Sequence, residues 1–208
     1  MSSAGVTPPR SVFTTVVLVQ GLILLIALAW WSLSSIVVHT SGKPGTFAIP
    51  LGLLIGVVSY ALGYLMIVRI PVLERALKTI TNRLYPHFSD FGWVQIVLVS
   101  VIAGVGEELL FRGLVQTGIG EGTSTEIGIV AAALLFGLVH MSGPLYFMLA
   151  VVMGLLLGIA YEWSQSIYLV MAWHIAYDIC ALGVIAKYPH LVADVVPAEE
   201  PEEVSTCG

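Results

Sequence analysis

Two adjacent glutamates, Glu107 and Glu108, stand inside a long apolar stretch of this 208-residue chain. A charged side chain at the centre of a membrane-spanning helix costs about 2.5 to 3.5 kcal/mol on insertion scales, so each glutamate requires a partner and indicates a function. Arg112 follows Glu108 by four residues, which places both on one face of a helix and predicts an ion pair. Glu107 points about 100° away from this pair.

The predicted ion pair gives the two glutamates different roles. Glu108 is held by Arg112 and is mainly structural, whereas Glu107 is left available. A carboxylate in a poorly solvated site is a stronger base than one in water, which favours Glu107 as a general base. The alternative is that Glu107 only forms a hydrogen bond to a neighbouring helix.

His140, His174 and Asp178 lie on later apolar segments of the chain. Phe136 precedes His140 by four residues and Asp178 follows His174 by four, so each pair shares one helix face. The Asp178 carboxylate is then placed to orient the His174 ring and to fix its tautomer. Together with Glu107, these side chains from three helices predict one convergent polar site, provided that the bundle brings the helices together.

The elements that must position these residues are membrane helices. The chain is 58% hydrophobic and only 10% charged, whereas soluble domains carry about a quarter charged residues. Three runs contain no Asp, Glu, Lys or Arg and reach the length of about 20 residues that spans a bilayer: 11–42, 44–68 and 127–161. The composition excludes a soluble protein and predicts an all-α, polytopic transmembrane helix bundle, hence a multi-pass membrane protein.

Apolar runs and turn residues predict six spanning helices and one amphipathic helix. The spans are expected at about residues 12–38, 47–70, 92–117, 123–140, 144–163 and 167–186. Between residues 71 and 91, Leu73, Leu77, Ile80 and Leu84 share one face, which is typical of a helix that lies in the membrane interface on anionic lipid. A bundle of five or seven elements with one re-entrant piece is the alternative.

Several glycines predict places where helices approach closely. Gly52 and Gly56 on the second predicted span, and Gly154 and Gly158 on the fifth, have the spacing of small residues that allows close helix contact. Gly104, Gly106 and Gly113 flank the acidic pair, so another backbone, or a substrate, is expected to come near Glu107.

The chain divides into three expected regions. Residues 1–91 hold two spanning helices that look like generic anchors, followed by the interfacial helix; residues 92–187 hold the core; residues 188–208 form an acidic tail that is expected to be disordered. Lysines and arginines gather on the side of the N-terminus, which predicts that both termini are cytoplasmic. We expect membrane lipid as a partner and no nucleic acid.

Three motifs occur in order on successive helices of the core: Glu107-Glu108-xxx-Arg112, Phe136-xxx-His140 and His174-xxx-Asp178. In this order they resemble the CAAX prenyl protease and bacteriocin-processing family of intramembrane proteases, which includes the type II CAAX prenyl endopeptidases and the Abi proteins. The resemblance covers about residues 92–186 and makes this region an intramembrane protease core. The first two spanning helices match nothing specific.

The resemblance implies hydrolysis of a peptide bond in a membrane-embedded or prenylated peptide or protein, with Glu107 activating water. It implies that His140 helps to hold the water or a metal. It also implies that His174 and Asp178 stabilise the oxyanion that develops on the scissile carbonyl. Three further residues are expected to hold the site in shape: Glu108, Arg112 and Phe136.

The resemblance also makes zinc a possible cofactor, because family members are commonly called metalloproteases. The candidate ligands are three side chains of the site: Glu107, His140 and His174. The zinc motif HExxH is absent from the sequence. A glutamate mechanism without a metal uses the same residues.

Asp178 departs from the family pattern, because many relatives have Asn at this position. An ionised Asp accepts hydrogen bonds but cannot donate one to an oxyanion. The alternatives are that Asp178 is protonated, that it orients His174, or that it completes a metal site.

Two other classes of function are compatible with intramembrane Glu, His and Asp. One is a proton- or cation-coupled transporter, since such residues form relays. Against it, the sequence has no paired inverted halves and no second set of acidic residues in the first two helices. The other is a bacteriocin-immunity or scaffold protein that keeps the fold and binds a partner without cleaving it.

Overall fold

The computed structural model describes residues 12–40 and 42–192, and this part of the chain is helical without a β-strand. The longer helices are α1 (Val12–Leu33), α2 (Ala48–Ile67), α3 (Pro71–Phe88), α4 (Trp93–Glu108), α6 (Thr125–Val139), α7 (Pro144–Ser164) and α8 (Ile167–Lys187). Shorter elements are the 3-10 turns η1 (Gly45–Phe47) and η3 (Pro189–Leu191), the π-helix η2 (Leu109–Gln116) and α5 (Thr117–Gly122). The predicted all-α, polytopic bundle is confirmed.

Within residues 12–40 and 42–192, five segments are long and apolar enough to cross a membrane: Val12–Leu33, Gly45–Ile67, Trp93–Gly122, Pro144–Ser164 and Ile167–Lys187. The fourth predicted span is the shorter helix α6, whose 15 residues rise about 22 Å, less than the roughly 30 Å of hydrocarbon in a bilayer. It begins after Ser124, whose side chain accepts a hydrogen bond from Ile127 N at 3.4 Å, and not at residue 123 as predicted. The cytoplasmic placement of both termini stays a prediction.

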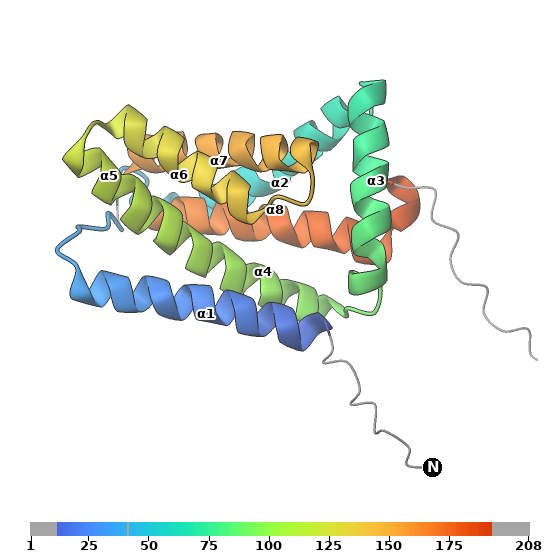
Figure 1. Cartoon of the computed structure of the whole chain (residues 1–208), viewed down its shortest axis with the longest axis horizontal. Coiled ribbons are helices and arrows are strands. Elements are labelled where there is room, and N and C mark those ends of the chain that lie inside the picture. Colours follow the sequence, from blue (N-terminus) through green and yellow to red (C-terminus); the bar gives the residue numbers. More distant parts are fainter. Residues whose placement is uncertain (1–11, 41, 193–208) are drawn as a thin grey trace, which may run out of the picture.

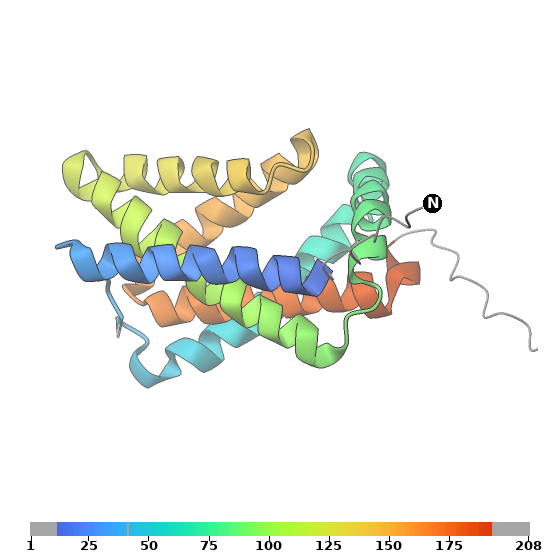
Figure 2. The same cartoon turned by 60° about the horizontal axis from the view of Figure 1, so that its bottom comes forward.

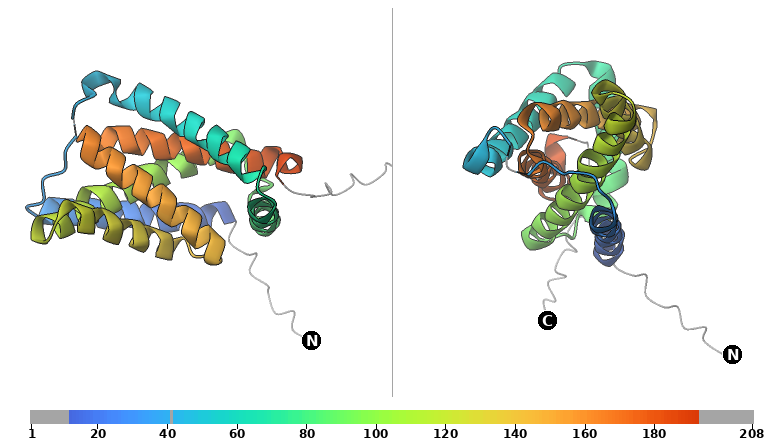
Figure 3. Two further views of the ribbon diagram at one scale, coloured as in Figure 1. Left: turned by 90° about the horizontal axis from the view of Figure 1, so that it is seen from above. Right: turned by 90° about the vertical axis from the view of Figure 1, so that its left-hand side faces the viewer.

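Helix α8 lies at the centre of the bundle, between α2 and α4 (Figure 3). The predicted close contacts at glycines are confirmed: a Cβ at Gly52 or Gly56 would collide with the backbone oxygens of Leu169 or Trp173 on α8. Helix α6 packs on α7, where a Cβ at Gly154 would lie 3.0 Å from the Cα of Ala133. Because α8 carries two of the predicted site residues, these contacts fix its position relative to the other helices.

Helix α1 packs along α4 on the other side of the bundle (Figure 2). The contact is close at Gly106, where a Cβ would lie 3.1 Å from the Cα of Leu24. The approach of a second backbone beside Glu107, predicted from this glycine, is therefore confirmed. Helix α1 ends at Leu33 and not near residue 38, and Val38 in the following segment is buried in the core.

Helix α3 runs across the direction of α1 and α8 at one end of the bundle, and α4 lies obliquely to it (Figure 1). This direction is the one expected of a helix in the membrane plane when the other helices span the bilayer. Its predicted apolar face is only partly available to lipid, since Leu77, Ile80 and Leu84 line a cavity inside the bundle. Within the predicted tail, residues 188–192 are described and include the 3-10 turn η3; residues 193–208 lie outside the described residues, so the disorder of the tail stays a prediction.

Candidate active site

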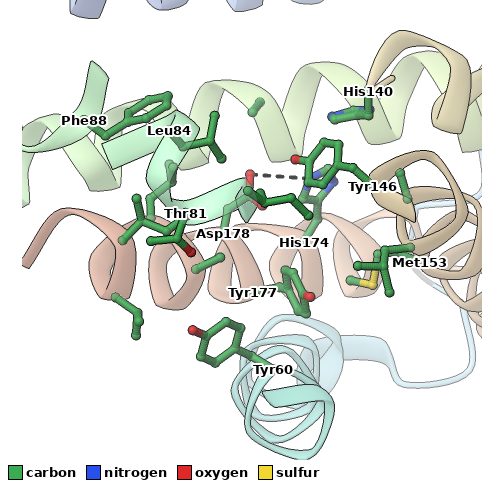
Figure 4. Close-up of a pocket in the computed structure, with 18 of the residues that line it drawn as sticks. Tyr60, Thr81, Leu84, Phe88, His140, Tyr146, Met153, His174, Tyr177 and Asp178 are labelled. Carbon is green, nitrogen blue, oxygen red and sulfur yellow. Dashed lines mark ion pairs between the residues drawn. The ribbon is translucent and has the colours of Figure 1, made fainter. Parts of the chain in front are cut away.

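A cavity of about 300 Å³ opens between α3 and the helices α1, α2, α4, α7 and α8. Its lining includes all four predicted catalytic residues: Glu107, His140, His174 and Asp178. Most of the remaining lining is apolar, with Tyr60, Tyr146 and Tyr177 among the exceptions (Figure 4). The structure thus brings the three sequence motifs to one cavity.

The ion pair predicted from helical spacing is present at the end of α4. Arg112 Nη1 lies 2.8 Å from Glu108 Oε1, and the two side chains are 1% and 0% exposed. Arg112 Nη2 also donates to the carbonyl oxygen of Gly154 on α7 at 3.2 Å, and its guanidinium carbon lies 4.6 Å from the centre of the Phe136 ring. The pair therefore ties α4 and η2 to α6 and α7.

Beyond Glu108 the predicted continuous α-helix changes to the π-helix η2. The Thr117 hydroxyl donates to the carbonyl oxygen of Arg112 at 3.0 Å, five residues earlier, a spacing that suits the wider turn. Short π-helical segments occur often at functional sites. Here the wider turn carries Arg112 and follows directly on the two glutamates.

His174 binds Glu108 more closely than it binds the predicted partner Asp178. Its Nδ1 lies 2.8 Å from Glu108 Oε1, whereas its Nε2 lies 3.5 Å from Asp178 Oδ2 and 3.9 Å from Glu107 Oε2. The first contact is a hydrogen bond, and the longer two exceed the usual range. Glu108 thus holds both Arg112 and His174 through one oxygen.

His140 is fixed by its own helix end. Its Nδ1 donates to the carbonyl oxygen of Phe136 at 2.8 Å, which directs Nε2 to Glu107 Oε2 at 3.6 Å. The Phe136 ring centre lies 4.4 Å from the ring centre of His140 and 5.8 Å from that of His174. Phe136 therefore packs against both histidines.

The two carboxylate oxygens of Glu107 differ in their hydrogen bonds. Oε1 accepts a hydrogen bond from Gln20 Nε2 at 2.8 Å, while Oε2 is buried and has no hydrogen-bond partner in the described part of the chain. The side chain is only 4% exposed. Buried polar atoms in native proteins are usually paired, so an unpaired carboxylate oxygen that faces two histidines marks a place for a reacting group.

Sequence reasoning missed two residues of this site. Gln20 comes from α1, which was expected to be a generic anchor, yet it is the one amide in the apolar run from Val16 to Ala29, and that isolation was an available signal. Tyr146 of α7 lies beside the two histidines and Asp178 (Figure 4). No sequence pattern distinguishes it from other tyrosines in apolar helices.

Two requirements decide whether the predicted ligands hold a metal ion: the orientation of the histidine rings and three donors placed around one point. The ring orientations suit one, because both histidines use Nδ1 for a hydrogen bond and turn Nε2 toward Glu107 Oε2. However, no group of three or more His, Cys, Asp or Glu within residues 12–40 and 42–192 is placed to hold a metal. Metal binding by Glu107, His140 and His174 therefore stays a prediction.

Comparison with known proteins agrees with the order of the motifs. Residues 89–180 match the family model described as type II CAAX prenyl endopeptidase Rce1-like. The uncharacterized protein YpbD of Bacillus subtilis (strain 168) is 30% identical over 104 residues, which make up 49% of this chain and 47% of that protein. The chain thus spans about half the length of this curated relative. No solved structure matches.

The matched segment contains every residue of the three motifs and leaves out α1, α2 and α3. It confirms the resemblance on which the predicted site was based. Over residues 89–180, this chain is thus similar to the type II CAAX prenyl endopeptidase Rce1-like family.

Proposed function

We propose that this protein is an intramembrane endopeptidase in which Glu107 activates the water that hydrolyses a peptide bond. The observation that carries the proposal is the divided environment of the Glu107 carboxylate, with Oε1 held by Gln20 and Oε2 buried, unpaired and 3.6 Å from His140 Nε2. A general base needs an oxygen that is within reach of water and not already occupied. The similarity of residues 89–180 to the type II CAAX prenyl endopeptidase Rce1-like family supports the same activity.

In the proposed reaction, Glu107 Oε2 takes a proton from water while the water oxygen bonds to the carbonyl carbon of the scissile peptide. His140 Nε2 accepts the other proton of this water in a hydrogen bond. His174, protonated on both ring nitrogens, donates from Nδ1 to Glu108 and from Nε2 to the oxyanion that develops. The carbon–nitrogen bond then breaks as the proton on Glu107 passes to the leaving nitrogen, which restores the carboxylate.

Asp178 is assigned a supporting role in this scheme. When ionised it cannot donate to the oxyanion. Its Oδ2 lies 3.5 Å from His174 Nε2, so its negative charge favours a proton on that nitrogen. Asp178 would then act through His174.

The substrate we propose is a membrane-embedded or prenylated peptide. The support is the composition of the cavity, whose lining beyond the polar residues consists of side chains such as Leu84, Phe88, Leu149 and Met153. Such a lining accepts an apolar group and excludes most water from the reacting bond.

The purified full-length protein in detergent is tested on a panel of farnesylated peptides and unmodified transmembrane peptides, with products identified by mass spectrometry. Glu107→Gln keeps the shape of the side chain and removes the base, and we expect cleavage to fall at least about a thousandfold. Glu121→Gln is the matched control, because Glu121 is exposed on α5. Equal cleavage by Glu107→Gln and the parent would contradict the proposal. Ion flux in proteoliposomes that disappears in Glu107→Gln, without any peptide cleavage, would favour a transporter.

Zinc binding by Glu107, His140 and His174 stays a prediction. Metal content is measured on the active enzyme after dialysis against a chelator, together with the cleavage rate. A metal that copurifies in a 1:1 ratio, is lost in His140→Ala and restores activity when added back would establish it. Full activity of metal-depleted enzyme would contradict it.

A further inference from the structure

We infer that Gln20 of α1 is a positioning residue for Glu107 and sets which oxygen of this carboxylate acts as the base. The inference rests on the proposed function, because it assigns Gln20 a role in the same hydrolysis. Gln20 lies outside residues 89–180, the segment that matches the family. Through its hydrogen bond to Glu107, Gln20 connects helix α1 with the proposed base of the core.

The contact itself has a defined direction. A carboxylate only accepts hydrogen bonds, so the amide group of Gln20 must turn its nitrogen toward Glu107. Gln20 Nε2 lies 2.8 Å from Glu107 Oε1. The amide oxygen of Gln20 is buried without a hydrogen-bond partner among the described residues, so the bond to Glu107 is the one that holds this amide in place.

The bond divides the two oxygens of Glu107. With Oε1 occupied by Gln20, rotation of the carboxylate is restricted and Oε2 is left pointing toward His140 Nε2 at 3.6 Å and His174 Nε2 at 3.9 Å. Without the bond, either oxygen can turn toward the histidines or away from them. A base must be held in the reactive geometry, and a displacement of about 1 Å reduces a rate by about a hundredfold.

Packing of α1 on α4 makes this contact possible. A Cβ at Gly106 would lie 3.1 Å from both the Cα and the Cβ of Leu24, so the two helix backbones are close at this point. Leu24 follows Gln20 by one helical turn and shares its face. Gly106 therefore allows α1 to come near enough for Gln20 to reach the neighbouring Glu107.

A bond that only satisfies a buried carboxylate would affect folding, whereas a positioning bond affects the chemical step. Gln20→Met keeps the length of the side chain and removes its donor. The expected result is a fall in kcat of roughly 10- to 100-fold with KM within about twofold of the parent, because Gln20 contacts the base and not the substrate. The probe is the best-cleaved peptide of the panel, with the full-length enzyme in the same detergent.

Leu22→Met is the matched control, since Leu22 is 58% exposed on the same helix, and we expect its kcat to equal that of the parent. Gly106→Ala is the second variant. It leaves Gln20 in place but pushes α1 away from α4, and the same fall in kcat is expected from it. Melting temperature and gel filtration show whether each variant is folded.

Three results would overturn the inference. They are an unchanged kcat in Gln20→Met, a loss that appears only in KM, and an equal loss in Leu22→Met. Glu107→Gln in the same assay separates this inference from the proposed function. If Glu107→Gln is inactive while Gln20→Met keeps its kcat, only the role of Gln20 is wrong; if Glu107→Gln cleaves like the parent, the proposed function is wrong as well.

Discussion

The surroundings of Glu108 and of Glu107 differ although the two residues are adjacent in the chain. Glu108 is fully buried, and one of its oxygens accepts from both Arg112 and His174 at 2.8 Å. Each glutamate has one oxygen without a hydrogen-bond partner within the described residues, but Glu107 lines the cavity, and its Oε2 lies 3.6 Å from His140 Nε2. On the Glu108 side of the site, Arg112 and His174 occupy the carboxylate and close it to other groups. On the Glu107 side, the carboxylate faces the cavity and is open to a reactant.

This difference indicates a division of labour between neighbouring carboxylates. Contacts of Glu108 join α4 to η2 and α8, and its partner Arg112 also binds α7, so that side of the site holds the helices in register. Glu107 makes one hydrogen bond, to α1, and is otherwise placed for chemistry. Changes on the Glu108 side should therefore affect stability first, and changes on the Glu107 side should affect activity first.

Arg112→Met removes the ion pair with Glu108 and should have the largest effect on stability. It leaves Glu108 buried without its main countercharge, and removal of one partner of a buried ion pair costs about 3 to 5 kcal/mol. Unfolding followed by tryptophan fluorescence in mixed detergent micelles measures this loss. Lys187→Met, at the end of α8, is the control for loss of one positive charge. A variant as stable as the parent would show that the pair does not hold the helices together.

His174 lies between the two sides, and two substitutions separate its nitrogens. His174→Asn keeps an amide near Nδ1, where it can still bind Glu108, and removes Nε2; we expect cleavage to fall about 100- to 1,000-fold with little change in melting temperature. His174→Gln places its amide near Nε2 instead and should be the less stable of the two. The opposite ranking of the two melting temperatures would contradict the assignment of Nδ1 to Glu108.

Asp178→Asn should have the smallest effect. An amide can donate to the oxyanion directly, so we expect the cleavage rate to stay within about tenfold of the parent, a difference of about 1.4 kcal/mol in the barrier. Steady-state cleavage of the same peptide measures it. A loss as large as that of His174→Asn would mean that Asp178 acts on the substrate or the water directly and not through His174.

The parts of the site that the sequence predicts are those that depend on local spacing. Glu108 and Arg112 are four residues apart, so their ion pair follows from helix geometry alone. The contact between Gln20 and Glu107 spans 87 residues and depends on how α1 packs on α4, which periodicity does not reveal. Gln20 was detectable as an isolated polar residue, but its partner was not.

The fold shows the same limit. Apolar runs identify the spanning segments because length and composition decide them. After Glu108 the chain forms a π-helix, in which the Thr117 hydroxyl donates to the carbonyl oxygen of Arg112. Helix propensities do not predict this change from α-helix to π-helix. The apolar face of α3 was assigned to lipid because amphipathicity does not say whether the neighbour is lipid or a cavity.

The most direct test of the division of labour compares Glu107→Gln and Glu108→Gln in one experiment, with peptide cleavage and melting temperature measured on the same preparations. We predict that Glu107→Gln loses cleavage at least about a thousandfold and melts close to the parent, because its Oε2 makes no stabilising contact. Glu108→Gln should melt well below the parent, because Arg112 loses its countercharge. If Glu107→Gln cleaves as fast as the parent, or if the two variants lose the same stability, the account of the two glutamates is contradicted.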